Sequence, residues 1–261
     1  MAAAKKTSMM MPALLKTFGW EVLFVSMVMM YYDCIMSKPI VHFENDWLRI
    51  SYLPQVPIGT HYFSEKNKEV TSYKIFPQAG AIVAADDRTA KEIKGHGLIF
   101  KTLPRATMIE MSMADCPAIT LIDESSRAVG ILHLGWFGLY SGSVKTFIDR
   151  FLEHTQSKQN NLLIFIGPGI CGQCFTLNGF KGWVRIGLFY FSCWRRYLGR
   201  NNKNFSFDIK EALLSELRTL GFLDEQVNLL DRCTYESLDF ASHRRDGLRR
   251  KFTNLTVIEA K

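Results

Sequence analysis

The residues best suited to chemistry are a cysteine and a histidine that end two neighbouring predicted strands. Cys116 lies in MSMADCP, directly before Pro117, and His133 lies in GILHLGW. Because each residue ends a strand just before a turn, we expect the two side chains to lie within a few ångströms of each other. A thiolate and an imidazole together favour Zn²⁺ or Cu over Mg²⁺ or Ca²⁺. The pair predicts a nucleophile or a metal site, and the alternative is that both residues are simply buried in the core.

A metal site of this kind needs a third ligand, and two upstream histidines, His61 and His96, are the candidates. A separate CxxC pair, Cys171 and Cys174, follows a Gly-Pro-Gly turn. The sequence contains no second CxxC pair. We therefore interpret this motif as a turn with two small residues, in preference to a structural zinc site or a redox pair.

Positive charge is concentrated in one stretch of the chain. The net charge is +7, and residues 181–203 hold six basic residues and no acidic residue. The rest of the chain is almost neutral, which argues against general nucleic-acid binding. Within this stretch, 183–197 is largely apolar between arginines. We interpret it as an element that covers the core or a loop, with solvated arginines, in preference to a membrane-surface element.

A second basic run, SHRRDGLRRKF, lies near the C-terminus and includes Arg244 and Arg245. Guanidinium groups bind oxyanions through paired hydrogen bonds, so this run is a candidate phosphate clamp. The alternative is a solvated basic face.

The elements that must position these residues alternate between strands and helices. Apolar runs predict strands in 107–122, broken at Pro117, and in 127–134, 161–167 and 252–258. Helical spacing predicts a helix over 141–154, capped by Ser141 or Ser143, and a turn over 135–138 before it. A second helix over 207–222 has a capping box at Asp208 and Glu211 and a terminating glycine at position 221. This alternation predicts an α/β or α+β fold.

The composition is that of an ordinary globular protein. The chain has 261 residues, of which 48% are hydrophobic and 22% charged, which excludes extensive disorder. Six cysteines are too few for a disulfide framework, so we expect reduced thiols in a cytoplasmic protein. The longest uncharged apolar run near the N-terminus, 22–32, is shorter than the roughly 20 residues of a membrane span. We interpret 1–37 as an extension and 38–261 as the domain.

Five segments occur in the order found in one known family. They are ADCPAITLID (114–123), HLGWFGLYSGSVKTFID (133–149), IGPGICGQCF (166–175), FDIKEALLSELRTLGF (207–222) and CTYESLDFASHRRDG (233–247). Over roughly residues 45–261, the chain resembles the polyphenol-oxidase or laccase-domain family, also described as multifunctional purine nucleoside phosphorylases.

The resemblance implies a fold, a metal and an activity. The fold is a single-domain α/β sandwich of mixed β-sheets with outer helices, and the metal is Zn²⁺ held by His, Cys and His. The activity is phosphorolysis of adenosine, inosine or methylthioadenosine, together with adenosine deamination, so a purine nucleoside and phosphate are the implied partners. By position, Cys116 and His133 match two of the metal ligands, and Arg244 and Arg245 match the family's Arg-Arg-Asp motif.

Departures from the family pattern leave more than one function open. Gly80 stands where the first histidine ligand is expected, and Phe137 stands where the family has an arginine. The segment 61–70 and the basic segment 181–203 have no clear counterpart, and His96 is the residue that could replace the missing ligand.

The leading hypothesis is a zinc-dependent purine nucleoside phosphorylase, and the alternative is a non-catalytic member that binds a ligand or partner. A copper phenol oxidase ranks last, because the six histidines are widely scattered.

Overall fold

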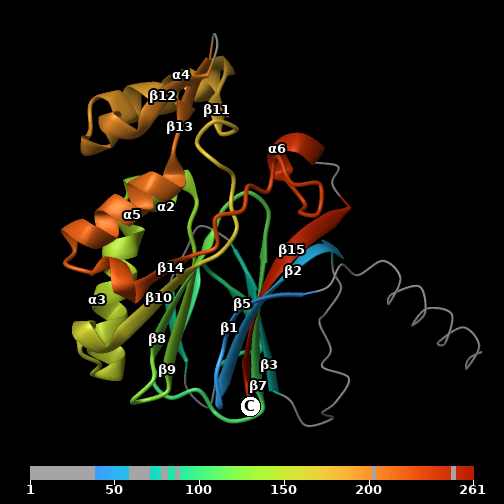
Figure 1. Ribbon diagram of the computed structural model, residues 1–261, viewed down its shortest axis with the longest axis vertical. Helices are drawn as coiled ribbons and strands as arrows, with labels where there is room; N and C mark the ends of the chain where they lie inside the picture. The colour runs from blue at the N-terminus through green and yellow to red at the C-terminus, as the bar shows by residue number, and fades with distance from the viewer. Residues whose placement is uncertain (1–38, 59–70, 78–81, 86–88, 202–203, 248–250) are drawn as a thin grey trace, which may run out of the picture. The chain divides into compact units, whose positions relative to one another are not determined.

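Two six-stranded mixed β-sheets form the centre of the fold in the computed structural model (Figure 1). The structure describes residues 39–261 apart from 59–70, 78–81, 86–88, 202–203 and 248–250, so the predicted extension over 1–37 lies outside the described residues. The first sheet has the order β1 (Ile40–Glu44), β2 (Leu48–Pro57), β15 (Phe252–Ala260), β7 (Thr107–Met113), β3 (Thr71–Phe76), β5 (Glu92–Lys94). The second has the order β14 (Val227–Leu229), β10 (Leu162–Ile166), β8 (Ala118–Asp123), β9 (Ala128–His133), β6 (Gly97–Phe100), β4 (Ile82–Ala85).

The two sheets pack face to face through a shared apolar core. Ile50 and Met111 from the first sheet are buried in the same cluster as Ile122 and Ile131 from the second. Strand β8 is central in its sheet and buried along its whole length. Because successive side chains point to opposite faces, Ile122 enters this core while Leu121 faces the other side of the sheet.

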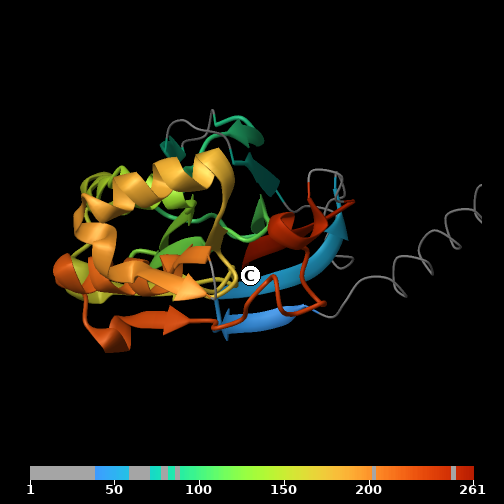
Figure 2. The ribbon, with the colours of Figure 1, turned by 90° about the horizontal axis from the view of Figure 1, so that it is seen from above.

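Helices cover that other side of the second sheet (Figures 1 and 2). The described helices are α2 (Trp136–Tyr140), α3 (Ser143–Thr155), α4 (Gly179–Tyr190), α5 (Ile209–Thr219) and the short α6 (His243–Asp246). Phe147 and Phe151 of α3 pack directly on Gly130 of β9, where a Cβ atom would lie 2.9 Å or less from each ring. A glycine at 130 therefore sets how closely the helix approaches the sheet. The predicted sandwich of mixed sheets with outer helices is confirmed.

The helix boundaries agree with the sequence in one case and differ in another. Helix α5 begins at the predicted N-cap, because the carboxylate of Asp208 accepts a hydrogen bond of 3.0 Å from the backbone N–H of Glu211. The other half of the predicted capping box is not formed, since the N–H of Asp208 donates to the carbonyl of Tyr197. Gly221 follows its end with φ +88°. The predicted serine cap of α3 is wrong, because its N-cap is Gly142, with φ +76° and no side-chain hydrogen bond. The predicted turn over 135–138 is instead the start of α2.

The basic segment forms α4, a 3-10 helix over Cys193–Tyr197, and β12 (Leu198–Asn201), up to the end of its described part. Strand β13 (Asn204–Phe207) pairs with both β12 and β11 (Thr176–Leu177) in a small third sheet. Ile186 and Phe189 of α4 join the core beneath the helices, which supports the interpretation that this segment covers the core.

Its arginines, however, are not simply solvated, since four of them lie over aromatic rings. The pairs are Arg185 over Trp136, Arg195 over Tyr190, Arg196 over Tyr197 and Arg200 over Phe205. Trp183 and Phe191 are exposed in the same segment, and so is Phe180 directly before it. Among the described helices, none combines the length and the apolar character needed to cross a membrane.

A partly buried carboxyl on α5 should make the stability of this protein depend on pH. One side-chain oxygen of Glu216 is buried without a hydrogen-bond partner among the described residues, and burial raises the pKa of this carboxyl from 4.5 to about 7. As the pH rises through that window, the unfolded chain loses this proton first, so the free energy of unfolding falls.

We therefore expect Glu216→Gln to be more stable than the wild type at pH 8, by on the order of 1–2 kcal/mol after solvent screening. Below pH 4.5 the two proteins should be equally stable, because the carboxyl is then neutral in both states. Urea unfolding at pH 4 and pH 8 measures the difference. An equal stability gain at both pH values would contradict burial of the charge as the cause.

Candidate functional site

The turn between β7 and β8 carries Cys116 and is held by its neighbour, Asp115. Strand β7 ends at Met113, so the predicted strand alternation does not extend to Cys116. Asp115 has φ +74°, a left-handed conformation that aspartate tolerates better than most residues. Its buried carboxylate accepts hydrogen bonds of 2.7 Å from the hydroxyl of Thr234 and from the backbone N–H of Arg244. Asp115 therefore joins the Cys116 turn to two segments near the C-terminus.

His133 ends the adjacent strand and lies close to Cys116, as the sequence predicts. In the β8–β9 register, Ala118 pairs with His133, and the backbone N–H of Leu134 donates to the carbonyl of Pro117 at 3.0 Å. A Cβ atom at Gly135 would lie 3.5 Å from Sγ of Cys116 and 3.9 Å from Cε1 of His133. The thiol and the imidazole thus border the same glycine, and any larger residue at 135 would fill the space beside them.

His96 is brought next to His133 by strand pairing. It directly precedes β6, which pairs with β9 so that Gly97 lies opposite Leu132. The backbone N–H of His133 donates to the carbonyl of His96 at 2.8 Å, and the ring centroids are 5.7 Å apart with the planes 19° from parallel. His61 and Gly80, the other positions considered for this ligand, lie outside the described residues.

The imidazole of His133 is neutral and has a ring nitrogen with a lone pair unused among the described residues. Burial and the neighbouring His96 lower the pKa of His133 to about 4, so the ring is neutral near pH 7. Its Nδ1 atom is buried and has no hydrogen-bond partner among the described residues. A neutral imidazole with an unused ring nitrogen is the form that binds a metal ion or accepts a proton.

Two arginines belong to the surroundings of the Cys116 turn: the backbone of Arg244 is hydrogen-bonded to Asp115, and Arg185 interacts electrostatically with both Cys116 and Arg244. The guanidinium of Arg185, on α4, is 4.7 Å from the centroid of Trp136. Burial lowers the pKa of Arg185, the charge of Arg244 lowers it further, and Cys116 acts in the opposite direction. Arg244 itself lies 5.5 Å from the Phe175 ring centroid and 3.4 Å from Oγ1 of Thr176. Neither arginine forms an ion pair with a carboxylate in the described part of the chain.

The guanidinium of the next residue, Arg245, is occupied by structural hydrogen bonds. One of its terminal nitrogens donates to the carbonyls of Thr234, Tyr235 and Ser237, at 3.1–3.2 Å. The other donates to the carbonyl of Phe240, and Nε pairs with Asp246 at 2.8 Å. These bonds occupy the guanidinium in holding the loop that leads into α6.

The family of this chain follows from comparison with known proteins. Residues 79–258 match the family model described as multi-copper polyphenol oxidoreductase laccase, which is well over half of the chain. The chain belongs to this laccase family. The resemblance drawn from its motifs is therefore confirmed.

Relatives within the laccase family carry a different functional name. The chain is 25% identical over 146 residues to purine nucleoside phosphorylase YlmD of Bacillus subtilis (strain 168), covering 56% of this chain and 52% of that protein. It is 23% identical over 177 residues to a purine nucleoside phosphorylase of Aquifex aeolicus (strain VF5), covering 68% of this chain and 77% of that one. The chain thus spans about half the length of the Bacillus subtilis relative.

The fold is shared with solved structures. The crystal structure of Bacillus licheniformis hypothetical protein YfiH superimposes with a TM-score of 0.64 at 19% identity, over 82% of this chain and 93% of that one. At this identity the likeness establishes the fold of the laccase family alone.

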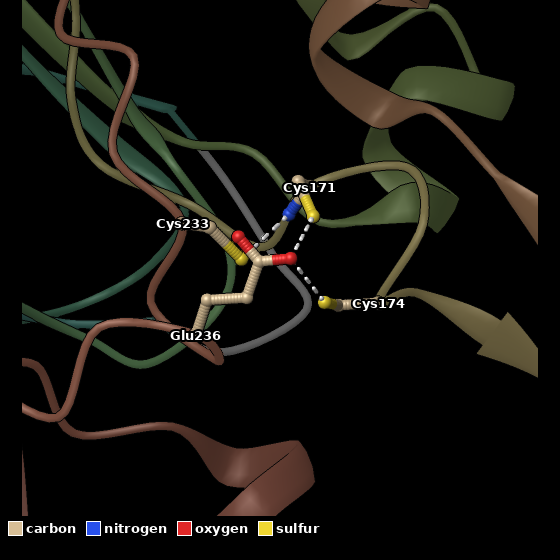
Figure 3. A group of neighbouring side chains, drawn as sticks. All are labelled: Cys171, Cys174, Cys233 and Glu236. Carbon is tan, nitrogen blue, oxygen red and sulfur yellow. Dashed lines mark hydrogen bonds between the residues drawn. The ribbon is translucent and has the colours of Figure 1, made fainter.

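Sequence reasoning missed two features of this laccase-family member. Arg185 was counted only as part of a basic stretch, although its position on a helix that ends near Trp136 brings it to the site. The CxxC pair forms a turn, as interpreted, but its neighbours were not foreseen. Cys171 and Cys174 lie with Cys233 and Glu236 (Figure 3), in the one group of three or more metal-type ligands that the described residues bring within 4.8 Å of one another. The signal was a second two-residue spacing, Cys233-x-x-Glu236.

Proposed function

We propose that this protein is a metal-dependent purine nucleoside phosphorylase. One observation carries the proposal. Cys116 and His133 border the same glycine, His96 stacks on His133, and Arg185 interacts electrostatically with Cys116 and Arg244. Soft and borderline donors in the neighbourhood of arginines that form no ion pair among the described residues are suited to a metal ion and an oxyanion. The names of the relatives support the same activity.

The residues that would hold the metal are Cys116, His133 and His96. Their ligand atoms do not all lie within 4.8 Å of one another in this structure, so their side chains would have to turn toward a shared ion. The unpartnered Nδ1 atom of His133 fits this role, because a buried nitrogen without a hydrogen bond is costly unless something binds it. A thiolate and imidazoles suit Zn²⁺, and copper is the less favoured alternative. When bound, zinc would supply Lewis-acid polarisation of the reacting oxygen.

Arg185 and Arg244 would bind the phosphate. Burial and the charge of Arg244 lower the pKa of the Arg185 guanidinium, and a phosphate bound next to both arginines would offset this repulsion. The sequence predicts Arg244 and Arg245 as the phosphate clamp. Because the hydrogen bonds of Arg245 are structural, we assign the second phosphate contact to Arg185 instead. Arg185 would thereby supply the positive charge that Phe137 does not.

The reaction is a displacement at the anomeric carbon of the ribose. A phosphate oxygen forms a bond to C1′ while the bond from C1′ to the purine nitrogen breaks, and the base leaves with the electron pair and takes up a proton. The two arginines would orient phosphate and stabilise its charge during the attack. The products are a free purine and ribose 1-phosphate. Attack of water at C6 of adenosine would instead give inosine and ammonia.

The test is chromatography of adenosine and inosine incubated with the full chain, with and without phosphate, after loading with Zn²⁺ or Cu²⁺. We expect free purine and ribose 1-phosphate only when phosphate is present. Inosine formed from adenosine without phosphate would indicate the deaminase activity instead. Tight adenosine binding without any product would support the non-catalytic alternative, and oxidation of a phenol by the copper-loaded protein would support the oxidase.

A further inference from the structure

Three cysteines and one glutamate form a compact group outside the site described above (Figure 3). Cys171 and Cys174 lie between β10 and β11, and Cys233 and Glu236 lie in the loop that follows β14. One carboxylate oxygen of Glu236 is 3.3 Å from Sγ of Cys174 and 3.7 Å from Sγ of Cys171. All four ligand atoms lie within 4.8 Å of one another.

Mainly backbone contacts hold the two loops together, and one of the ligand thiols also accepts a hydrogen bond from the backbone. The backbone N–H groups of Cys174 and Phe175 both donate to the carbonyl of Cys171, at 3.1 and 3.0 Å, which closes the CxxC turn. Gly169 forms a parallel bridge with Cys233, and the N–H of Cys171 donates to Sγ of Cys233 at 3.3 Å. The four ligands are therefore brought together by the fold.

We propose that Cys171, Cys174, Cys233 and Glu236 bind a structural Zn²⁺ ion. Three thiolates and a carboxylate provide the four ligands of a tetrahedral zinc site. Ligand atoms around such an ion lie roughly 3.5–3.8 Å apart, given zinc–sulfur bonds of about 2.3 Å. The observed spread is close to this, so small side-chain movements suffice. Thiolates select zinc over the hard cations Mg²⁺ and Ca²⁺.

The ion would brace the turn that carries Cys116. Next to Cys171, the backbone N–H of Ile170 donates to the carbonyl of Asp115 at 2.8 Å. Next to Cys233, the hydroxyl of Thr234 donates to the carboxylate of Asp115 at 2.7 Å. A metal that ties these two loops would fix both contacts of the residue before Cys116. This is a positioning role, because the ion would act on Cys116 through the contacts of Asp115.

Cobalt substitution in the full chain tests the site without any assay of turnover. Under reducing conditions, Co²⁺ bound to several thiolates gives an intense sulfur-to-metal charge-transfer band, and Zn²⁺ should displace it. We expect Cys171→Ser and Cys233→Ser to weaken metal binding at this site by about 100-fold or more. Glu236 is exposed, so Glu236→Gln should fold normally while binding metal about tenfold less tightly. This variant keeps the test informative if a cysteine variant does not fold.

Two controls separate this site from other thiols. Cys193 is exposed and lies outside the group, so Cys193→Ser should leave the charge-transfer band unchanged. Cys116→Ala should also retain the band, because Cys116 belongs to the candidate catalytic site. A band that survives Cys233→Ser but is lost in Cys116→Ala would overturn the proposal, as would titration of the denatured protein showing a disulfide between Cys171 and Cys174. A result that overturns this zinc site would not bear on the proposed phosphorylase activity, because the charge-transfer band is measured without turnover.

Discussion

Replacement of Cys116 by alanine should lower kcat/KM for phosphorolysis of adenosine by about 100-fold or more, because loss of a metal ligand costs at least as much as loss of an outer-shell partner. Cys116 borders Gly135 next to His133, so the variant removes one of the proposed zinc ligands and keeps the imidazole. Phosphate-dependent release of adenine, followed by chromatography with Zn²⁺ present, measures the effect.

The loss in Cys116→Ala should be chemical and not a consequence of unfolding. Cys116 is only partly buried, and removal of a single sulfur atom at such a position costs about 1 kcal/mol or less. The melting temperature should therefore stay near that of the wild type. Cys193→Ala is the matched control, since Cys193 is exposed in the same chain and should keep full activity. Undiminished turnover in Cys116→Ala would remove this thiol from the mechanism.

Replacement of Arg185 by alanine should raise the KM for phosphate by roughly 10- to 100-fold. A hydrogen bond to a charged group contributes about 1.5–3 kcal/mol, and each 1.4 kcal/mol corresponds to about tenfold in affinity. Arg185→Lys should recover part of the affinity, because it keeps the charge but loses the paired donors of the guanidinium. Initial rates at varied phosphate and saturating adenosine give the comparison.

Arg195→Ala is the matched control for Arg185. Arg195 lies in the same basic segment, and its guanidinium is 4.2 Å from the centroid of Tyr190, so the variant loses a similar aromatic contact. We expect the KM for phosphate to be unchanged in this variant. A similar rise in KM for both variants would indicate a general effect of positive charge, and no rise in either would exclude Arg185 as a phosphate ligand.

Much of the fold could be predicted from local patterns. The apolar runs around Pro117 became β7 and β8, with the proline between them, and RAVGILHL became β9. Asp208 caps α5 as predicted, because an N-cap needs only a side chain and a backbone N–H three residues apart. The proximity of Cys116 and His133 was also predictable, since both lie at the same end of two consecutive antiparallel strands.

The sequence by itself therefore determined strands β7 to β10 and β15, helices α3 and α5, and the Cys116–His133 pair, all of which depend on residues close together in the chain. Only the tertiary structure decided which distant residues join them. Arg185 reaches Trp136 because α4 packs through Ile186 and Phe189 on the core, and Cys233 reaches Cys171, 62 residues away, because β14 pairs with β10. Arg245 is directed to backbone carbonyls by the loop before α6. Such contacts follow from the order of strands in a sheet, which hydrophobic periodicity does not encode.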